Sequence, residues 1–125
     1  MVFWEIAMLT FYGYAKCSTC VNAKKFLARL GRPIAEIDIT TKPPSAAELR
    51  SLIAKSGRPY TDFLNRSGVQ YRERNMKEQV KTLPEDAIVA MLASEGRLLK
   101  RPIVTDGTRV TVGFLPEAFE MTWGR

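Results

Sequence analysis

The sequence predicts an α/β protein in which helices pack on one mixed four-stranded sheet. Three observations support this: a strand, a helix and a strand fill the first 40 residues, a block of helices follows, and a hairpin signal lies near the C-terminus. The length of 125 residues suits a single core. We therefore expect one domain over residues 1–125, with a helical insertion at about 45–97 between the second and third strands.

The first strand is predicted over residues 8–13, which are apolar and aromatic and end in glycine. Helical spacing of apolar residues then begins near Ser18, where the side-chain oxygen of Ser18 or Thr19 is expected to cap the helix, and Gly31 ends it. Residues 34–39 alternate between apolar and polar, which is typical of a strand. A connection through one helix predicts that these two strands are parallel.

The next helix is predicted to begin after Ser45. Glu48 follows three residues later, which is the spacing of a capping box. The helix should run through Lys55, and Gly57 should end it.

The rest of the helical block is less regular in pattern. Residues 61–65 indicate a short helical turn, residues 68–71 a loop, and residues 75–81 a further turn. Pro84 is suited to the first turn of a helix that runs to about Glu95 and stops at Gly96.

Two strands are predicted near the C-terminus, over residues 102–104 and 109–114. The Asp106-Gly107 pair between them is a strong hairpin signal. Pro116 then opens a last short helix over residues 117–121.

The composition excludes several classes of function. The chain has no histidine and two cysteines, which rules out Ser–His and Cys–His nucleophile pairs and a Cys/His zinc site within one chain. Its apolar stretches are far shorter than the roughly 20 residues that span a membrane, and residues 1–7 lack the features of a secretory signal. We expect a cytoplasmic monomer that holds no metal and does not associate with membranes.

The net charge of +6 favours anionic partners in general. The basic residues are spread along the chain, and no motif for direct nucleic-acid binding accompanies them. A basic, soluble surface is the simplest interpretation.

The residues that point to chemistry are the two thiols of the Cys17-Ser18-Thr19-Cys20 segment, between the first strand and the first helix. Unpaired N–H groups at a helix start favour a thiolate, and Lys16 adds a cation, so Cys17 is the expected nucleophile. Cys20, one turn later, is placed to resolve a mixed disulfide. Two incidental thiols, or half of a zinc site completed by another subunit, remain alternatives.

A second constellation is Arg101-Pro102, at the start of the third strand. We expect the bond before Pro102 to be cis, because only X–Pro bonds adopt this form at a low cost of about 0.5–1 kcal/mol. Arg101 would then point toward Cys17 and offer a fixed cation to a thiolate or an anionic substrate. Alternatively, Arg101 is a surface residue before an edge proline. Tyr14 is expected to belong to the strand rim.

Three segments together resemble a known family: FYGYAKCSTCVNAKKFL, FLNRSGVQYRERNMKE and LLKRPIVTDGTRVTVGF. From about residue 8 onward the chain resembles the arsenate-reductase-like family of thioredoxin-fold proteins, and in particular its branch of Spx-type redox regulators. The resemblance implies a thioredoxin-like fold interrupted by a helical insertion. Because family members usually start near Met8, residues 1–7 are expected to be an N-terminal extension.

The resemblance implies that Cys17 is the nucleophile and that Arg101 faces an anion. Arsenate reductases of this type use one cysteine and hold their oxyanion with three arginines, whereas this chain has Cys20 in place of a small polar residue. Asn65, with Arg66 beside it, stands near the position of the second arginine.

The third arginine of those enzymes would fall in the segment 111–114, which contains no arginine. Missing cations weaken oxyanion binding, because each arginine supplies charge-assisted hydrogen bonds. Arsenate reduction is therefore the least favoured of three hypotheses.

The first hypothesis is a thiol–disulfide or glutathione-dependent reductase, with glutathione or a protein disulfide as its partner and no bound cofactor. The alternative is an Spx-like transcriptional regulator, in which a Cys17–Cys20 disulfide switches binding to the RNA polymerase α-subunit. The resemblance suggests that a glycine of the insertion makes this contact, with Gly57 as the candidate. Sequence alone barely separates the two.

Overall fold

The computed structural model describes residues 8–124. The expected extension at residues 1–7 lies outside the described residues. The chain forms two compact units: the first takes the residues up to Asp38 and from Arg101 onward, and the second is Ile39–Lys100.

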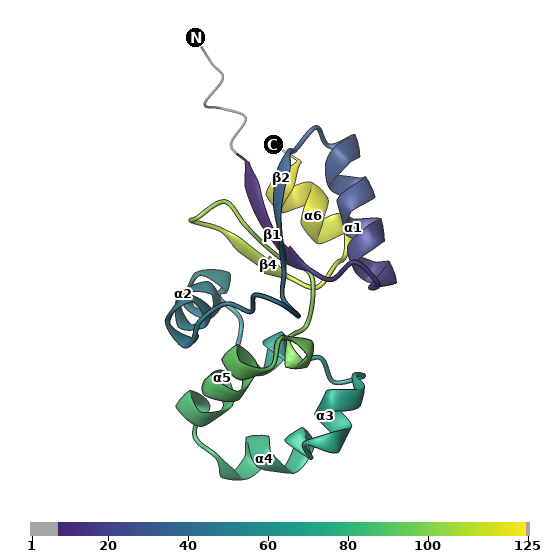
Figure 1. Cartoon of the computed structure of the whole chain (residues 1–125). Coiled ribbons are helices and arrows are strands. Elements are labelled where there is room, and N and C mark those ends of the chain that lie inside the picture. Colours follow the sequence, from purple (N-terminus) through teal and green to yellow (C-terminus); the bar gives the residue numbers. More distant parts are fainter. Residues whose placement is uncertain (1–7, 125) are drawn as a thin grey trace. The chain divides into compact units, whose positions relative to one another are not determined.

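The first unit is built on one mixed sheet of four strands in the order β2-β1-β3-β4 (Figure 1). The strands are β1 (Leu9–Gly13), β2 (Ile34–Asp38), β3 (Ile103–Thr105) and β4 (Val110–Val112). β1 is parallel to β2 and antiparallel to β3, and β4 is antiparallel to β3. The predicted α/β class, the mixed sheet and the parallel first pair are confirmed, although the last strand is shorter than the predicted 109–114.

Two helices pack with this sheet, α1 (Ser18–Arg29) and α6 (Pro116–Trp123), and they lie side by side in Figure 1. Their apolar faces meet the central strands in one core of fully buried side chains. The core consists of Leu9, Phe11, Cys20, Ala23, Leu27, Val104, Phe119 and Trp123. One of the two thiols is thus part of the hydrophobic core.

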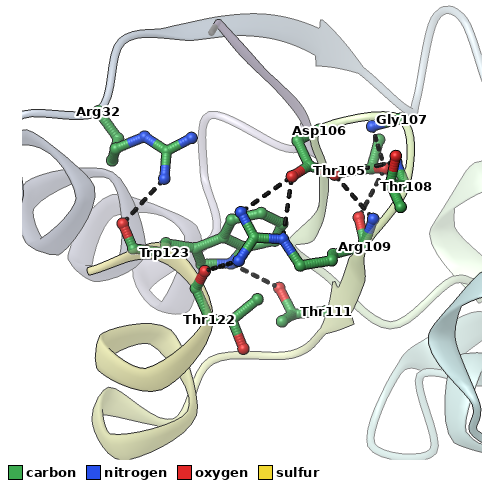
Figure 2. A network of polar contacts seen from close by, with 9 residues as sticks. All are labelled: Arg32, Thr105, Asp106, Gly107, Thr108, Arg109, Thr111, Thr122 and Trp123. Carbon is green, nitrogen blue, oxygen red and sulfur yellow. Dashed lines mark hydrogen bonds and ion pairs between the residues drawn. The ribbon is translucent and has the colours of Figure 1, made fainter. Parts of the chain in front are cut away.

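The C-terminal end of α6 is fastened by two arginines (Figure 2). Arg32 donates to the carbonyl of Trp123 at 2.9 Å, and Arg109 donates to the carbonyl of Thr122 at 2.6 Å. Both guanidinium groups also lie over the Trp123 ring, at 5.9 and 5.0 Å from its centroid. The last carbonyls of a helix have no partner within the helix, so these arginines supply the missing donors and hold α6 in place.

The second unit is helical. It contains α2 (Ala46–Ser56), η2 (Tyr60–Phe63), α3 (Val69–Glu73), α4 (Met76–Thr82), α5 (Glu85–Ser94) and η3 (Gly96–Leu98). The predicted capping box opens α2: the Glu48 N–H donates to the Ser45 hydroxyl at 3.1 Å, and the Ser45 N–H donates to the Glu48 carboxylate at 3.2 Å. Gly57 ends α2 at φ 69°, as predicted.

Two details of the helical block were predicted wrongly. The expected loop over 68–71 is largely the short helix α3, which starts at Val69. Gly96 does not end α5 but begins η3, and a Cβ there would collide with the backbone carbonyl of Ile39. Gly96 is therefore needed for close backbone contact, which its place after a helix does not reveal.

The helices within the described residues are all too short or too polar to cross a membrane.

Candidate functional site

The site lies where β1 passes into α1. After Gly13 the chain makes a turn in which the Cys17 N–H donates to the Tyr14 carbonyl at 3.1 Å. Cys17 is extended (φ −92°, ψ 115°), and its Sγ accepts a hydrogen bond from the Cys20 N–H at 3.3 Å. Cys17 itself is thus the N-cap of α1. The expectation that Ser18 or Thr19 caps the helix is wrong, because the helical conformation already begins at Ser18.

The two thiols differ in access to solvent, and both are free. Cys17 is half-buried, whereas Cys20 is only 1% exposed and lies in the core beside Phe11 and Ala23. A reagent from solution therefore reaches the Cys17 sulfur first, and the Cys20 sulfur is available mainly to Cys17.

Electrostatics also separates the thiols. Burial alone would raise the pKa of Cys17, but hydrogen bonds from the Cys20 thiol and the Cys20 N–H, together with the Arg101 guanidinium, lower it below its ordinary value. Each of these groups stabilises the charged form of the sulfur. Cys17 is thus the more acidic of the two thiols.

Cys20 is shifted in the opposite direction. Burial, and then the hydrogen bond that its thiol gives to Cys17, raise the pKa of Cys20 to about 12, against a smaller opposing effect from the Tyr14 backbone. The structure thus pairs a partly exposed thiol of lowered pKa with a buried thiol of raised pKa that donates to it.

Arg101 completes this site. The Arg101–Pro102 peptide bond is cis, as predicted. The Arg101 guanidinium hydrogen-bonds to the Cys17 sulfur and lies 5.7 Å from the centroid of the Tyr14 ring. The structure thus brings together Cys17, Cys20 and Arg101.

Three further residues were predicted for the site: Lys16, Asn65 and Arg66. Lys16 is exposed, and it is not among the groups that lower the pKa of Cys17. Asn65 and Arg66 belong to the second unit, where they donate to the carbonyls of Arg97 (3.5 Å) and Thr61 (3.2 Å). Together they line a cavity of about 210 Å³ within that unit, which Lys100 also lines.

Two residues of the site were missed in the sequence. The Tyr14 ring contacts Arg101 rather than serving only as strand rim. Gly13 leaves room for its neighbours, since a Cβ there would lie 2.6 Å from Phe11 Cε1 and 3.4 Å from Cys20 Sγ. An aromatic residue three positions before Cys17 is a weak signal of the contact with Arg101, and no sequence pattern indicates the close packing at Gly13.

Within residues 8–124, no three Cys, Asp or Glu side chains are grouped as a metal ion would require.

Comparisons with known proteins agree on the family. The sequence profile of the ArsC family matches residues 12–122. The protein YusI of Bacillus subtilis is 50% identical over 115 residues, which cover 92% of this chain and 98% of YusI. The crystal structure of an ArsC-family-related protein from Bacteroides fragilis superposes with a TM-score of 0.88 at 39% identity, covering 92% of this chain and 98% of that one.

More distant relatives fall into two functional groups. The global transcriptional regulator Spx of Streptococcus pneumoniae is 24% identical over 86% of this chain and 79% of the regulator. The arsenate reductase of Vibrio cholerae superposes with a TM-score of 0.80 at 26% identity, covering 90% of this chain and 94% of the enzyme. The relatives therefore include both a regulator and a reductase.

Proposed function

Because this chain belongs to the ArsC family and pairs two thiols at the start of its first helix, we propose that it is a cytoplasmic thiol–disulfide reductase that draws its electrons from glutathione. Cys17 is the nucleophile, Cys20 is the resolving thiol, and Arg101 orients an acidic group of the substrate. One observation carries this proposal: the partly exposed Cys17 thiol has a lowered pKa, while the adjacent Cys20 thiol is buried and has a raised pKa.

The first step is attack of the Cys17 thiolate on a substrate disulfide. The new bond joins Cys17 Sγ to one substrate sulfur, the substrate S–S bond breaks, and the second substrate sulfur leaves as a thiolate that takes a proton from water. The negative charge on Cys17 disappears in this step. The Cys20 thiol then loses the charged neighbour that helped to raise its pKa.

In the second step Cys20 gives up its proton and attacks Cys17 Sγ. The mixed disulfide breaks, the remaining substrate thiolate leaves, and a Cys17–Cys20 disulfide forms; two electrons have passed from the protein to the substrate. Two glutathione molecules restore the dithiol and leave as glutathione disulfide. A bridge over four residues constrains little of the chain, which suits a disulfide that forms and breaks in each cycle.

An arsenate substrate is disfavoured by the segment that would supply its third arginine. The Thr111 hydroxyl accepts from the Trp123 indole at 3.1 Å, and the Phe114 ring packs edge-to-face on Phe119 at 4.8 Å. These side chains serve packing and offer no cation, whereas an oxyanion needs several charged donors.

The test is turnover of a small mixed disulfide, with glutathione and glutathione reductase recycling the protein. We expect activity in the wild type, loss in Cys17→Ser, and accumulation of a Cys17 mixed disulfide in Cys20→Ser. Ser18→Ala is the matched control, since Ser18 lies between the thiols on the exposed side of the helix start, and it should keep full activity. Turnover in Cys17→Ser, or a wild type that reduces arsenate faster than disulfides, would overturn the proposal.

A second candidate function is a redox-switched transcriptional regulator that binds the RNA polymerase α-subunit. Similarity to the regulator Spx favours it. So does Gly57, which ends α2 in the left-handed conformation, has no neighbouring atoms where a Cβ would stand, and is exposed. A glycine in open space at a helix end allows close approach by another protein.

The regulator is tested by measuring how the reduced and the oxidised protein bind the C-terminal domain of the polymerase α-subunit. Gly57→Arg should abolish binding. Gly31→Arg is the matched control, because Gly31 has φ 73° and equally open surroundings but lies in the other unit. This function would be contradicted if the wild type and Gly57→Arg bound the α-subunit domain equally well, or if the reduced and oxidised proteins bound it equally well.

A further inference from the structure

We propose that Tyr14 is a positioning residue that holds the Arg101 guanidinium against the Cys17 sulfur through its aromatic ring. This inference rests on the proposed function of the Cys17–Cys20 pair. It assigns a role in that chemistry to the Tyr14 side chain through its contact with Arg101.

The geometry places Tyr14 at the centre of the site. Its carbonyl accepts the Cys17 N–H at 3.1 Å, and its backbone N–H faces the Cys20 sulfur. Its ring lies 5.7 Å from the Arg101 guanidinium carbon, within the range of a cation–π contact. One residue therefore contacts both cysteines through its backbone and Arg101 through its side chain.

Arg101 needs such a support because its side chain is long. Holding an arginine in one rotamer costs conformational entropy, and the half-buried Arg101 borders solvent that competes for its N–H groups. A ring against one face of the guanidinium restricts its motion and leaves the N–H edges directed at the sulfur. Arg101 can then act on Cys17 as a fixed rather than a mobile cation.

The role of the ring separates cleanly from the role of the backbone. A substitution of Tyr14 keeps its carbonyl and N–H, and so keeps the turn before Cys17 and the contact to Cys20. It removes only the support of Arg101. Tyr14→Phe retains the aromatic face, whereas Tyr14→Leu replaces it with a side chain that has no π system.

The experiment is a double-mutant cycle on the rate of Cys17 alkylation, followed by peptide mapping over a range of pH. At a pH well below the pKa of Cys17, the rate follows the fraction of thiolate. Tyr14→Leu should slow alkylation about two- to fivefold, the range expected of a partly exposed cation–π contact. Tyr14→Phe should react like the wild type, and urea unfolding confirms that each variant is folded.

The cycle decides whether the ring acts through Arg101. In the Arg101→Met background, Tyr14→Leu should cause no further loss, because no guanidinium remains to be held. Equal losses in both backgrounds, or a Tyr14→Phe variant as slow as Tyr14→Leu, would overturn the inference. The proposed function fails on a different readout, a wild type that forms no Cys17–Cys20 disulfide during disulfide reduction.

Discussion

Gly13→Ala should destabilise the protein and disturb Cys20, because Gly13 is the last residue of β1 and packs beside Phe11 and Cys20. The added methyl group would stand 2.6 Å from Phe11 Cε1, 3.1 Å from Phe11 Cδ1 and 3.4 Å from Cys20 Sγ. Non-bonded carbon atoms normally keep about 3.5–4.0 Å apart. The Phe11 ring would therefore have to move by about 1 Å.

The ring has little freedom to move. Phe11 is fully buried and belongs to the same cluster as Leu9, Cys20 and Leu27. Inserting a methyl group into a packed core costs about 1–3 kcal/mol, while the reduced chain entropy of alanine returns about 0.4–1 kcal/mol. The net loss is about 1–2 kcal/mol, which lowers the melting temperature by about 4–8 °C in a chain of this size.

Urea unfolding of the reduced protein, followed by circular dichroism, measures this free energy. Phe11→Leu provides the matched background, since leucine lacks the ring carbon that the methyl group meets. Gly13→Ala should be nearly neutral there, and the two substitutions should couple by about 1 kcal/mol or more. A wild-type background that tolerates Gly13→Ala without loss, or a cost that is the same in both backgrounds, would refute the reasoning.

Three further predictions concern stability. Ser45→Ala should lower the free energy of unfolding in urea by about 1 kcal/mol, because it removes the capping box of α2. The control Ser51→Ala, at an exposed position within the same helix, should leave it almost unchanged. Equal losses in the two variants would contradict the capping role of Ser45. Arg109→Met should lower the free energy of unfolding by about 1–2 kcal/mol, because it removes the donor to the Thr122 carbonyl and the contact with the Trp123 ring. Arg109→Lys should not restore this stability, and full stability in the lysine variant would show that a positive charge alone is sufficient. Burial and the hydrogen bond to Cys17 raise the pKa of Cys20 to about 12. The protonated Cys20 thiol therefore contributes fully to the free energy of unfolding below the unfolded-state pKa of about 8.5, and this contribution is lost as the pH rises toward 12. Cys20→Ala should flatten the fall in the free energy of unfolding at alkaline pH, and a pH dependence equal to that of the wild type would contradict the raised pKa.

Local sequence signals predicted the secondary structure wherever a few neighbouring residues determine the backbone. The capping box at Ser45, the left-handed Gly57 and the turn between β3 and β4 depend on side chains within four positions, and all three are present. The parallel pairing of β1 and β2 followed from the single helix that connects them. Gly96 was misread, because its role depends on the carbonyl of Ile39, far away in the sequence.

In the candidate site, too, the sequence indicated some features and did not indicate others. The spacing of Cys17 and Cys20 at a strand-to-helix junction indicated which thiol is exposed, and Arg101-Pro102 indicated a cation nearby. The sequence did not show that Cys17 caps its own helix, since serine and threonine are the usual capping residues. Nor did it show that Tyr14 contacts Arg101, because these residues are 87 positions apart in the sequence and are brought together by the pairing of β1 with β3.

The order of events at the two sulfurs is the most direct test of the account. The reduced protein is mixed with a limiting amount of glutathione disulfide, quenched with acid at successive times, and mapped by mass spectrometry. We expect a glutathione adduct on Cys17 that decays into the Cys17–Cys20 disulfide. A first adduct on Cys20, or a Cys17 adduct that persists in the wild type, would contradict the assignment of nucleophile and resolving thiol.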